Sequence, residues 1–247
     1  MTRKEFVRRF IIVHKCGGCG EILHHTCSDD ALCSECRLRW NAALTEGCEK
    51  CFKPAVECTC MSPLLSGSGA LSHRKLFFYD SENTMQAQMR MIFSLKRQKS
   101  RRLRGFAAEQ LYPFVVDEVS ALDFGGNKQN FAVCSCPRGV ESKTLYGFDH
   151  AELLAKSLAE LLGVEHLRLF YQRIGGKEQK DLDRKQRLEN AGKHIVMRKN
   201  VDVSGKYLII YDDMVTTGAS MSTCIKLALK AGARGVICCS LACSKKQ

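Results

Sequence analysis

The stretch YLIIYDDMVTTGAS runs from Tyr207 to Ser220 and decides how the second half of the chain is interpreted. Its first five residues are apolar or aromatic and predict a buried strand. Asp212 and Asp213 follow, and a short polar loop then leads into a predicted helix over 219–233. In open parallel sheets, ligands bind outside the carboxyl ends of the strands. The stretch therefore predicts that the two carboxylates face a ligand.

The loop after the two acids has the chemistry of a phosphate site. The free N–H groups and the dipole at the start of a helix favour an anion, and hydroxyl and glycine residues suit close contact with it. The two carboxylates can accept hydrogen bonds from sugar hydroxyls or hold a hydrated Mg²⁺. An acidic turn that caps a helix is the alternative interpretation. The predicted phosphate loop consists of Thr216, Thr217, Gly218, Ala219 and Ser220.

The rest of this half alternates between strand and helix patterns. Apolar runs predict further strands at 131–136, 167–172 and 235–243, and helical periodicity predicts helices over 80–95 and 149–163. Asp149 and Glu152 have the spacing of a capping box, and Gly163 predicts the end of the helix. Alternating strands and helices imply an α/β fold with a mostly parallel sheet flanked by helices.

Length and charge narrow the class of protein. The 247 residues allow one large domain, or a small module and a full domain, and the net charge of +12 favours nucleic acid or phosphorylated ligands. A basic soluble enzyme is the alternative. No apolar run approaches the roughly 20 residues of a membrane span, and no signal peptide is visible, so we expect a cytoplasmic protein. The candidate nucleic-acid contacts, or else an exposed basic helix end, are Lys96, Arg97, Lys99, Arg101, Arg102 and Arg104.

Nine of the 15 cysteines lie between Cys16 and Cys60, which argues for a local metal module and against a disulfide framework. Cys-x2-Cys pairs present two thiolates to one zinc ion, and structural zinc takes four ligands in a tetrahedron. Two ions are the simplest interpretation, although the pairs could interleave or the second set could be degenerate. Cys27 is left over as a spare. The candidate zinc ligands are Cys16, Cys19, Cys33, Cys36, Cys48, Cys51, Cys58 and Cys60.

A change in composition divides the chain. We predict a cysteine-rich zinc module over residues 10–62, a flexible Ser- and Gly-rich linker over 63–75, and a larger domain over 76–247.

The acid pair and its loop resemble the phosphoribosyl pyrophosphate (PRPP) signature of type I phosphoribosyltransferases. Together with the cysteine pairs, the chain from about Cys16 onward is similar to the ComF family of bacterial DNA-uptake proteins. The segments 135–156 and 172–190 resemble family motifs. The chain departs from the family at Ser135, at Asp149 and His150, and at Tyr146, where an arginine that could face pyrophosphate is common.

The resemblance implies a type I phosphoribosyltransferase-like domain in which Asp212 and Asp213 act on PRPP with Mg²⁺. The backbone at 136–138 would face pyrophosphate. It also implies a role in DNA uptake, with single-stranded DNA and a ComFA-like helicase as partners. The alternative is a nucleotide-salvage phosphoribosyltransferase with no DNA role, and whether any transfer occurs stays open. The candidate residues of a flexible loop over the site are Lys177, Gln179, Arg187 and Asn190.

Overall fold

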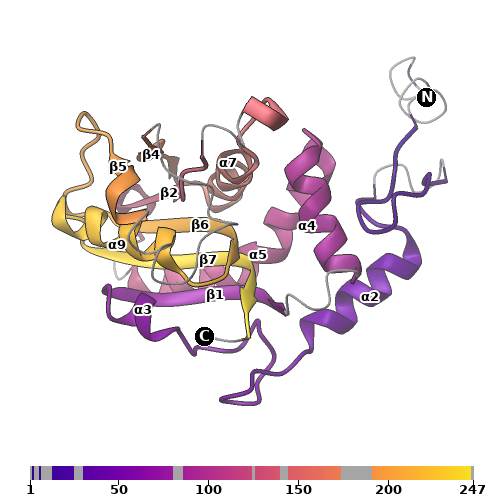
Figure 1. Cartoon of the computed structure of the whole chain (residues 1–247), viewed down its shortest axis with the longest axis horizontal. Coiled ribbons are helices and arrows are strands. Elements are labelled where there is room, and N and C mark those ends of the chain that lie inside the picture. Colours follow the sequence, from indigo (N-terminus) through magenta and orange to yellow (C-terminus); the bar gives the residue numbers. More distant parts are fainter. Residues whose placement is uncertain are drawn as a thin grey trace.

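A parallel sheet forms the centre of the molecule (Figure 1). The computed structural model describes residues 2, 6, 13–24, 30–79, 86–123, 126–139, 144–173 and 191–245. Within them, a sheet of five parallel strands has the order β1-β7-β6-β2-β3. The prediction of a mostly parallel sheet flanked by helices is confirmed. Its strands are β1 (Ala70–Tyr79), β2 (Phe131–Ser135), β3 (Glu165–His166), β6 (Tyr207–Val215) and β7 (Gly235–Ser244).

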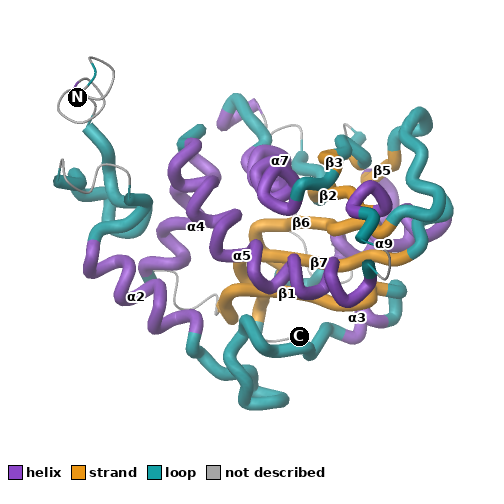
Figure 2. The backbone as a smooth tube through the Cα atoms, turned by 180° about the vertical axis from the view of Figure 1, so that it is seen from behind, coloured by secondary structure: helices purple, strands orange, loops and turns teal. Residues whose placement is uncertain are grey.

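Helices cover both faces of the sheet, as the tube drawing in Figure 2 also shows. Strand β7 is buried at every position except its last, as expected for a central strand with both faces covered. Side chains alternate along β6, so that Ile209 and Tyr211 enter one apolar core while Leu208 and Ile210 enter another. The helices are α2 (Ser34–Leu44), α3 (Pro63–Ser66), α4 (Ala87–Arg97), α5 (Arg101–Leu122), α7 (His150–Leu162) and α9 (Ala219–Lys230), with a 3₁₀ turn, η3 (Lys128–Asn130).

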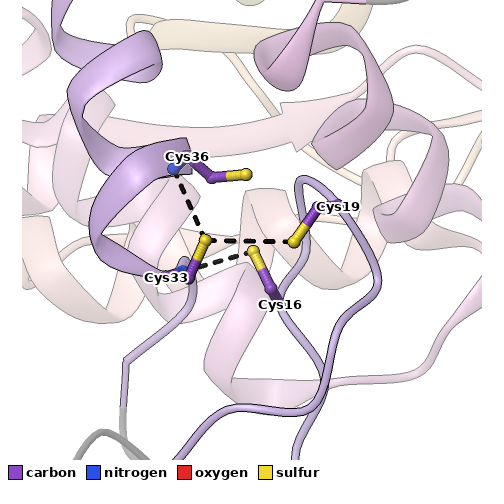
Figure 3. A group of neighbouring side chains, drawn as sticks. All are labelled: Cys16, Cys19, Cys33 and Cys36. Carbon is purple, nitrogen blue, oxygen red and sulfur yellow. Dashed lines mark hydrogen bonds between the residues drawn. The ribbon is translucent and has the colours of Figure 1, made fainter.

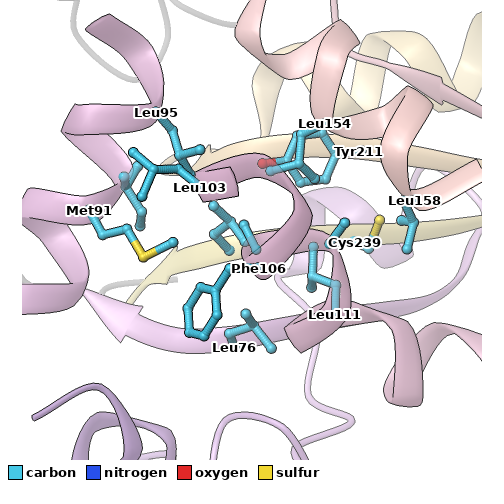
Figure 4. Close-up of a cluster of buried hydrophobic side chains, with 14 of the residues drawn as sticks. Leu76, Met91, Leu95, Leu103, Phe106, Leu111, Leu154, Leu158, Tyr211 and Cys239 are labelled. Atoms are coloured by element: carbon cyan, nitrogen blue, oxygen red, sulfur yellow. The ribbon is translucent and has the colours of Figure 1, made fainter. Parts of the chain in front are cut away.

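The core that contains Tyr211 lies between the sheet and helices α4, α5 and α7 (Figure 4). Helix α2 joins the same core through Trp40, which is fully buried and meets Phe77 of β1 and Phe106 of α5 edge to face. The Trp40 Nε1 donates a hydrogen bond to Gln110 Oε1 at 3.0 Å. The cysteine-rich segment therefore packs directly on the rest of the protein.

Helix α7 confirms the predicted caps. The Asp149 carboxylate accepts a hydrogen bond from the Glu152 N–H at 3.2 Å, and Gly163 ends the helix with a φ of 68°. Both caps depend on residues only a few positions apart in the chain, which is why the sequence pattern could identify them.

The prediction of a flexible linker over 63–75 is wrong. Pro63 begins helix α3, Ser62 caps it, and β1 starts at Ala70. Leu65 is fully buried, and the Ser68 Oγ lies 2.6 Å from the Ser222 Oγ of α9. The small residues of this segment therefore allow close packing, which the composition alone could not distinguish from flexibility.

Three other elements differ from their predictions. The basic run 96–104 forms the end of α4 and the start of α5, which begins at Arg101 after the cap of Ser100. The run at 167–172 contributes β4 (Phe170–Gln172), which pairs in antiparallel fashion with β5 (Ile195–Met197) outside the main sheet. Strand β6 continues to Val215, so the two aspartates lie inside the strand near its end.

Candidate functional site

The two aspartates lie near the carboxyl end of β6, beside the end of β2. Consecutive residues of a strand point to opposite faces, so Asp212 and Asp213 face different sides of the sheet. Asp213 is 3% exposed and lies on the side of helices α4 and α7, whereas Asp212 is half-buried. The Asp212 carboxylate accepts a hydrogen bond from the Asp213 N–H at 2.9 Å, which fixes its orientation.

Cationic side chains from two other elements converge on Asp213. The Lys96 Nζ, at the end of α4, lies 2.7 Å from Asp213 Oδ2, and Arg138, from the loop after β2, donates to Asp213 Oδ1. His150, the first residue of α7, lies with its Nε2 3.4 Å from the same carboxylate and 2.7 Å from the Arg138 Nη2. Residues far apart in the sequence thus form one polar cluster under the carboxyl edge of the sheet.

The pKa values of the two aspartates are shifted in opposite directions. Burial opposes ionisation of Asp213, but the charges of Arg138 and Lys96 outweigh it and hold the pKa of Asp213 well below its usual range. Burial, followed by the negative charge of Asp213, raises the pKa of Asp212 well above its usual range. The site therefore holds one firmly ionised carboxylate and one carboxyl group that an arriving cation would help to ionise.

His150 serves in this cluster as a neutral imidazole. Burial is the main reason why its pKa is lowered from the ordinary value. An Arg138 N–H can donate to His150 Nε2 only when that nitrogen carries no proton, which agrees with the lowered pKa. His150 therefore lies close to Asp213 without forming an ion pair with it. The positive charges that balance the Asp213 carboxylate are those of Lys96 and Arg138.

The predicted phosphate loop connects β6 to α9. Gly218 has a φ of 78°, which favours glycine, and a Cβ atom there would lie 3.3 Å from the Leu65 Cδ2. Thr217 Oγ1 accepts a hydrogen bond from the Ala219 N–H at 3.4 Å, and Thr216, Thr217 and Ser220 are half-buried. The loop leads directly into a helix of 12 residues, whose first N–H groups suit an anion.

The structure separates the predicted nucleic-acid residues into groups. Lys96 belongs to the cluster around Asp213, and Arg104 is 9% exposed, so neither lies on an open surface. Arg102 donates a hydrogen bond to the Lys15 carbonyl oxygen at 2.7 Å. Exposed side chains remain at Arg97, Lys99 and Arg101, around the junction of α4 and α5. The candidate loop residues Lys177, Gln179, Arg187 and Asn190 lie outside the described residues.

Sequence reasoning missed the roles of the Arg138 and His150 side chains. A signal for Arg138 was present, because it follows the predicted strand 131–136 and the carboxyl ends of neighbouring parallel strands meet at one edge. No comparable signal marked His150 or Lys96, whose contacts with Asp213 depend on how α7 and α4 pack against the sheet.

The predicted cysteine ligands gather into two groups of four. In each group the sulfur atoms lie within 4.8 Å of one another. The sulfurs of the first group point toward one another from the hairpin around residues 15–22 and the start of α2, as Figure 3 shows. The first group is Cys16, Cys19, Cys33 and Cys36, and the second is Cys48, Cys51, Cys58 and Cys60.

Both groups fit structural zinc. A tetrahedron with Zn–S bonds of about 2.3 Å places its sulfurs about 3.8 Å apart, and Cys19 Sγ lies 3.9 Å from Cys33 Sγ. Burial opposes ionisation of Cys16, but backbone N–H donors, including those of Gly18 and Cys33, lower its pKa to about 7, whereas burial raises the pKa values of Cys19 and Cys36. The pairs do not interleave, and the groups supply the thiolate chemistry of two closed sites.

Comparisons with known proteins bear on the whole chain. No family model matches the sequence. The competence protein ComFC of Streptococcus pneumoniae (strain ATCC BAA-255 / R6) is 29% identical over 213 residues, which covers 84% of this chain and 86% of that protein. A purine phosphoribosyltransferase from Pyrococcus horikoshii Ot3 is similar in structure with a TM-score of 0.32 and 15% identity, over 54% of this chain and 72% of that one. The first relative confirms the resemblance to the ComF family.

Proposed function

We propose that this ComF-like protein binds PRPP with Mg²⁺ at the end of β6. We propose further that it is a cytoplasmic component of DNA uptake that binds single-stranded DNA through its basic surfaces and cysteine groups. The observation that carries the first proposal is the meeting of the acid pair, the loop 216–220 and the cations Arg138 and Lys96 at one edge of the sheet. Within the described residues, no helix is long and apolar enough to cross a membrane.

Each part of PRPP has a matching group in the chain. Asp212 and Asp213 would accept hydrogen bonds from the ribose hydroxyls and hold the ion, and the loop 216–220 would bind the 5′-phosphate. Mg²⁺, when bound, neutralises part of the diphosphate charge. Arg138 lies where a diphosphate between the ends of β2 and β6 would meet it.

Lys96 is the second cation for the diphosphate. The chain has Tyr146 where the family commonly has an arginine, and Lys96 brings a positive charge to the cluster from α4 instead. A diphosphate would compete with Asp213 for Lys96 and Arg138, and this exchange would release the carboxylate for the ribose and the ion.

The DNA proposal rests on charge and on the ComFC relative. Arg97, Lys99 and Arg101 are exposed around the junction of α4 and α5, close in the chain to Lys96. Such a surface suits phosphate contacts without sequence preference. Other DNA-uptake proteins, such as a ComFA-like helicase, are the proposed protein partners.

A thermal-shift titration with Mg²⁺ and PRPP tests the first proposal. Ligand that binds the folded state raises the melting temperature of the native protein, following the logarithmic law of mass action. Asp212→Ala/Asp213→Ala should lose the shift and keep its zinc, as measured by elemental analysis. An equal shift in the variant and the native protein would refute the placement of the site.

Fluorescence anisotropy with a labelled oligonucleotide tests the DNA proposal. We expect an affinity for single strands that falls steeply with salt, and a smaller salt slope for Arg97→Gln/Lys99→Gln/Arg101→Gln. Binding that is absent at low salt, or that does not depend on salt, would exclude this role.

A further inference from the structure

The two cysteine groups each begin with the same backbone turn. In the first, the Cys16 N–H donates to the Glu21 carbonyl at 2.8 Å and the Gly20 N–H donates to the Cys16 carbonyl at 2.9 Å. In the second, the Cys48 N–H donates to the Lys53 carbonyl and the Phe52 N–H to the Cys48 carbonyl, both at 2.8 Å. Gly20 and Phe52 therefore occupy equivalent positions, each directly after the second cysteine of its turn.

This position requires a left-handed backbone in both turns. Gly20 has a φ of 82°, which glycine adopts without strain. Phe52 has a φ of 60° and is the one residue other than glycine with a positive φ in the described part of the chain. For a bulky side chain this conformation is costly and marks a true outlier. A phenylalanine at this position therefore needs a compensating benefit.

Packing inside the protein does not supply that benefit. The Phe52 side chain is 84% exposed, so little of its surface is removed from water. The segment between α2 and α3, which carries Phe52, projects from the body of the molecule in both views (Figures 1 and 2). The cysteine turn imposes this conformation, because the Phe52 N–H donates to the Cys48 carbonyl, and backbone strain of this kind clusters at functional sites. The exposed ring at this strained position is therefore a candidate contact for another molecule.

The surroundings of Phe52 indicate an anionic partner. Lys50 and Lys53 flank it in the turn, and both side chains are exposed. The same turn borders a cavity of about 220 Å³, which Lys50 lines together with Glu49. Lys75 and Lys245 also line it, but the Lys75 Nζ donates to the carbonyls of Cys58 and Cys60 and the Lys245 Nζ pairs with Glu46, so Lys50 and Lys53 are the cations that face a partner. An exposed aromatic ring beside basic side chains is the arrangement that binds single-stranded nucleic acid, because bases stack on the ring while lysines contact phosphates.

We propose that Phe52 is a stacking platform for a base of single-stranded nucleic acid, with Lys50 and Lys53 as its phosphate contacts. This inference rests on the proposed DNA binding and assigns part of it to one turn of the chain. It also assigns different contributions to these residues: the stacking by Phe52 should not depend on salt, whereas the phosphate contacts of Lys50 and Lys53 should.

The variant Phe52→Gly tests the platform with little risk to folding, because the first turn has glycine at the equivalent position. Its melting temperature and zinc content should equal or exceed those of the native protein. Its affinity for a labelled oligothymidine should fall by about 5- to 150-fold, the range for loss of one stacked base. Phe52→Trp should restore binding, since it keeps an aromatic ring at the same position.

Two further measurements separate stacking from charge. Phe52→Gly should leave the dependence of affinity on salt unchanged, whereas Lys53→Gln should reduce the slope by about 0.7 for one lost phosphate contact. An oligonucleotide whose bases are replaced by abasic sites should bind native protein and Phe52→Gly equally. These results would tie the effect of Phe52 to a base.

The outcomes distinguish this inference from the function on which it rests. If native protein binds the oligonucleotide and Phe52→Gly binds it equally well, the platform is refuted while DNA binding stands. That result would also be expected if Phe52 contacted another protein. If native protein binds no oligonucleotide at low salt, both proposals fall.

Discussion

The two cysteine groups share a ligand pattern and a backbone turn but are attached to the protein in different ways. The first is held by α4 and α5, where the Ser94 Oγ donates to the Gly17 carbonyl at 2.9 Å and Arg102 donates to the Lys15 carbonyl. The second lies against β1, where the Lys75 Nζ donates to the carbonyl oxygens of Cys58 and Cys60, each at 3.0 Å. The same metal-binding unit is thus used in two structural settings.

Because the two cysteine groups contact different elements, we expect them to stabilise different parts of the protein. The first group supports α4, and the last turn of α4 carries Lys96, which contacts Asp213. The second group stands at the edge of the sheet and exposes Phe52. We therefore expect damage to the first group to reach the acid pair, and damage to the second to remain local.

Removing ligands should show the largest contrast. Cys16→Ser/Cys19→Ser should abolish zinc binding at the first group, and structural zinc contributes on the order of 10 kcal/mol in small modules. This is comparable to the whole stability of a domain, so the chain should unfold in part and lose its response to PRPP. Cys48→Ser/Cys51→Ser should lose one zinc and keep the response, as measured by thermal shift. Equal loss in both variants would remove the distinction.

The aromatic residues of the two regions give the next contrast. Trp40→Ala should lower the free energy of unfolding by about 3–5 kcal/mol, because it leaves a cavity between α2, β1 and α5. Phe52→Ala removes an exposed ring and should change stability by less than about 0.5 kcal/mol. Urea denaturation measures both values. A loss at Phe52 as large as that at Trp40 would show that Phe52 packs within the protein.

Lys96 tests the connection between the first region and the site. Lys96→Met should weaken PRPP binding about 10- to 100-fold, the effect of losing one charge-assisted hydrogen bond. Ribose 5-phosphate, which has no diphosphate, should bind the variant at least as well as native protein, because Asp213 loses one competing cation. Calorimetry measures both ligands, and the exposed neighbour Arg97→Met is the matched control. Equal losses for both ligands would indicate a general structural defect.

The smallest expected effect concerns β1, beneath the second group. His73 is buried, its Nε2 lies 2.9 Å from the Ser240 Oγ, and burial lowers its pKa to about 3. The unfolded chain, with a histidine pKa of about 6.5, binds more protons between these values, so stability decreases as the pH falls through this window. His73 alone should account for a loss of about 1 kcal/mol between about pH 7 and about pH 5.5.

The variant His73→Gln keeps a donor for Ser240 and has no group that titrates in this range. Its stability, measured by urea denaturation, should depend less on pH than that of the native protein by this amount. The same pH dependence in both proteins would mean that other groups cause it.

Sequence patterns predicted the features that depend on neighbours in the chain. The caps of helix α7, the apolar run of strand β6 and the spacing of the cysteine ligands all depend on residues a few positions apart. The groups around Asp213 come from three separate elements, so their meeting depends on tertiary packing that no local pattern records.

The errors have physical causes of the same kind. Ser and Gly residues near 63–75 suggested flexibility, yet Ser68 contacts Ser222, which lies far along the chain. The basic run suggested one surface, but it crosses from one helix to another, so its side chains point in different directions and Arg104 is buried. Charge and composition describe which residues are present, whereas exposure depends on the fold around them.

The strand order has a consequence for the way the chain is made. Strand β1 pairs with β7, which lies between β1 and β6 in the sheet and comes last in the sequence among the described strands. During synthesis, β1 therefore leaves the ribosome long before its partner exists. Until β7 is synthesised, β1 has no partner strand, and its apolar side chains, among them Phe77, are not yet buried. An unpaired apolar strand of this kind is prone to pair with other chains. The sheet can be completed only after β7 has been synthesised, because β7 pairs with both β1 and β6.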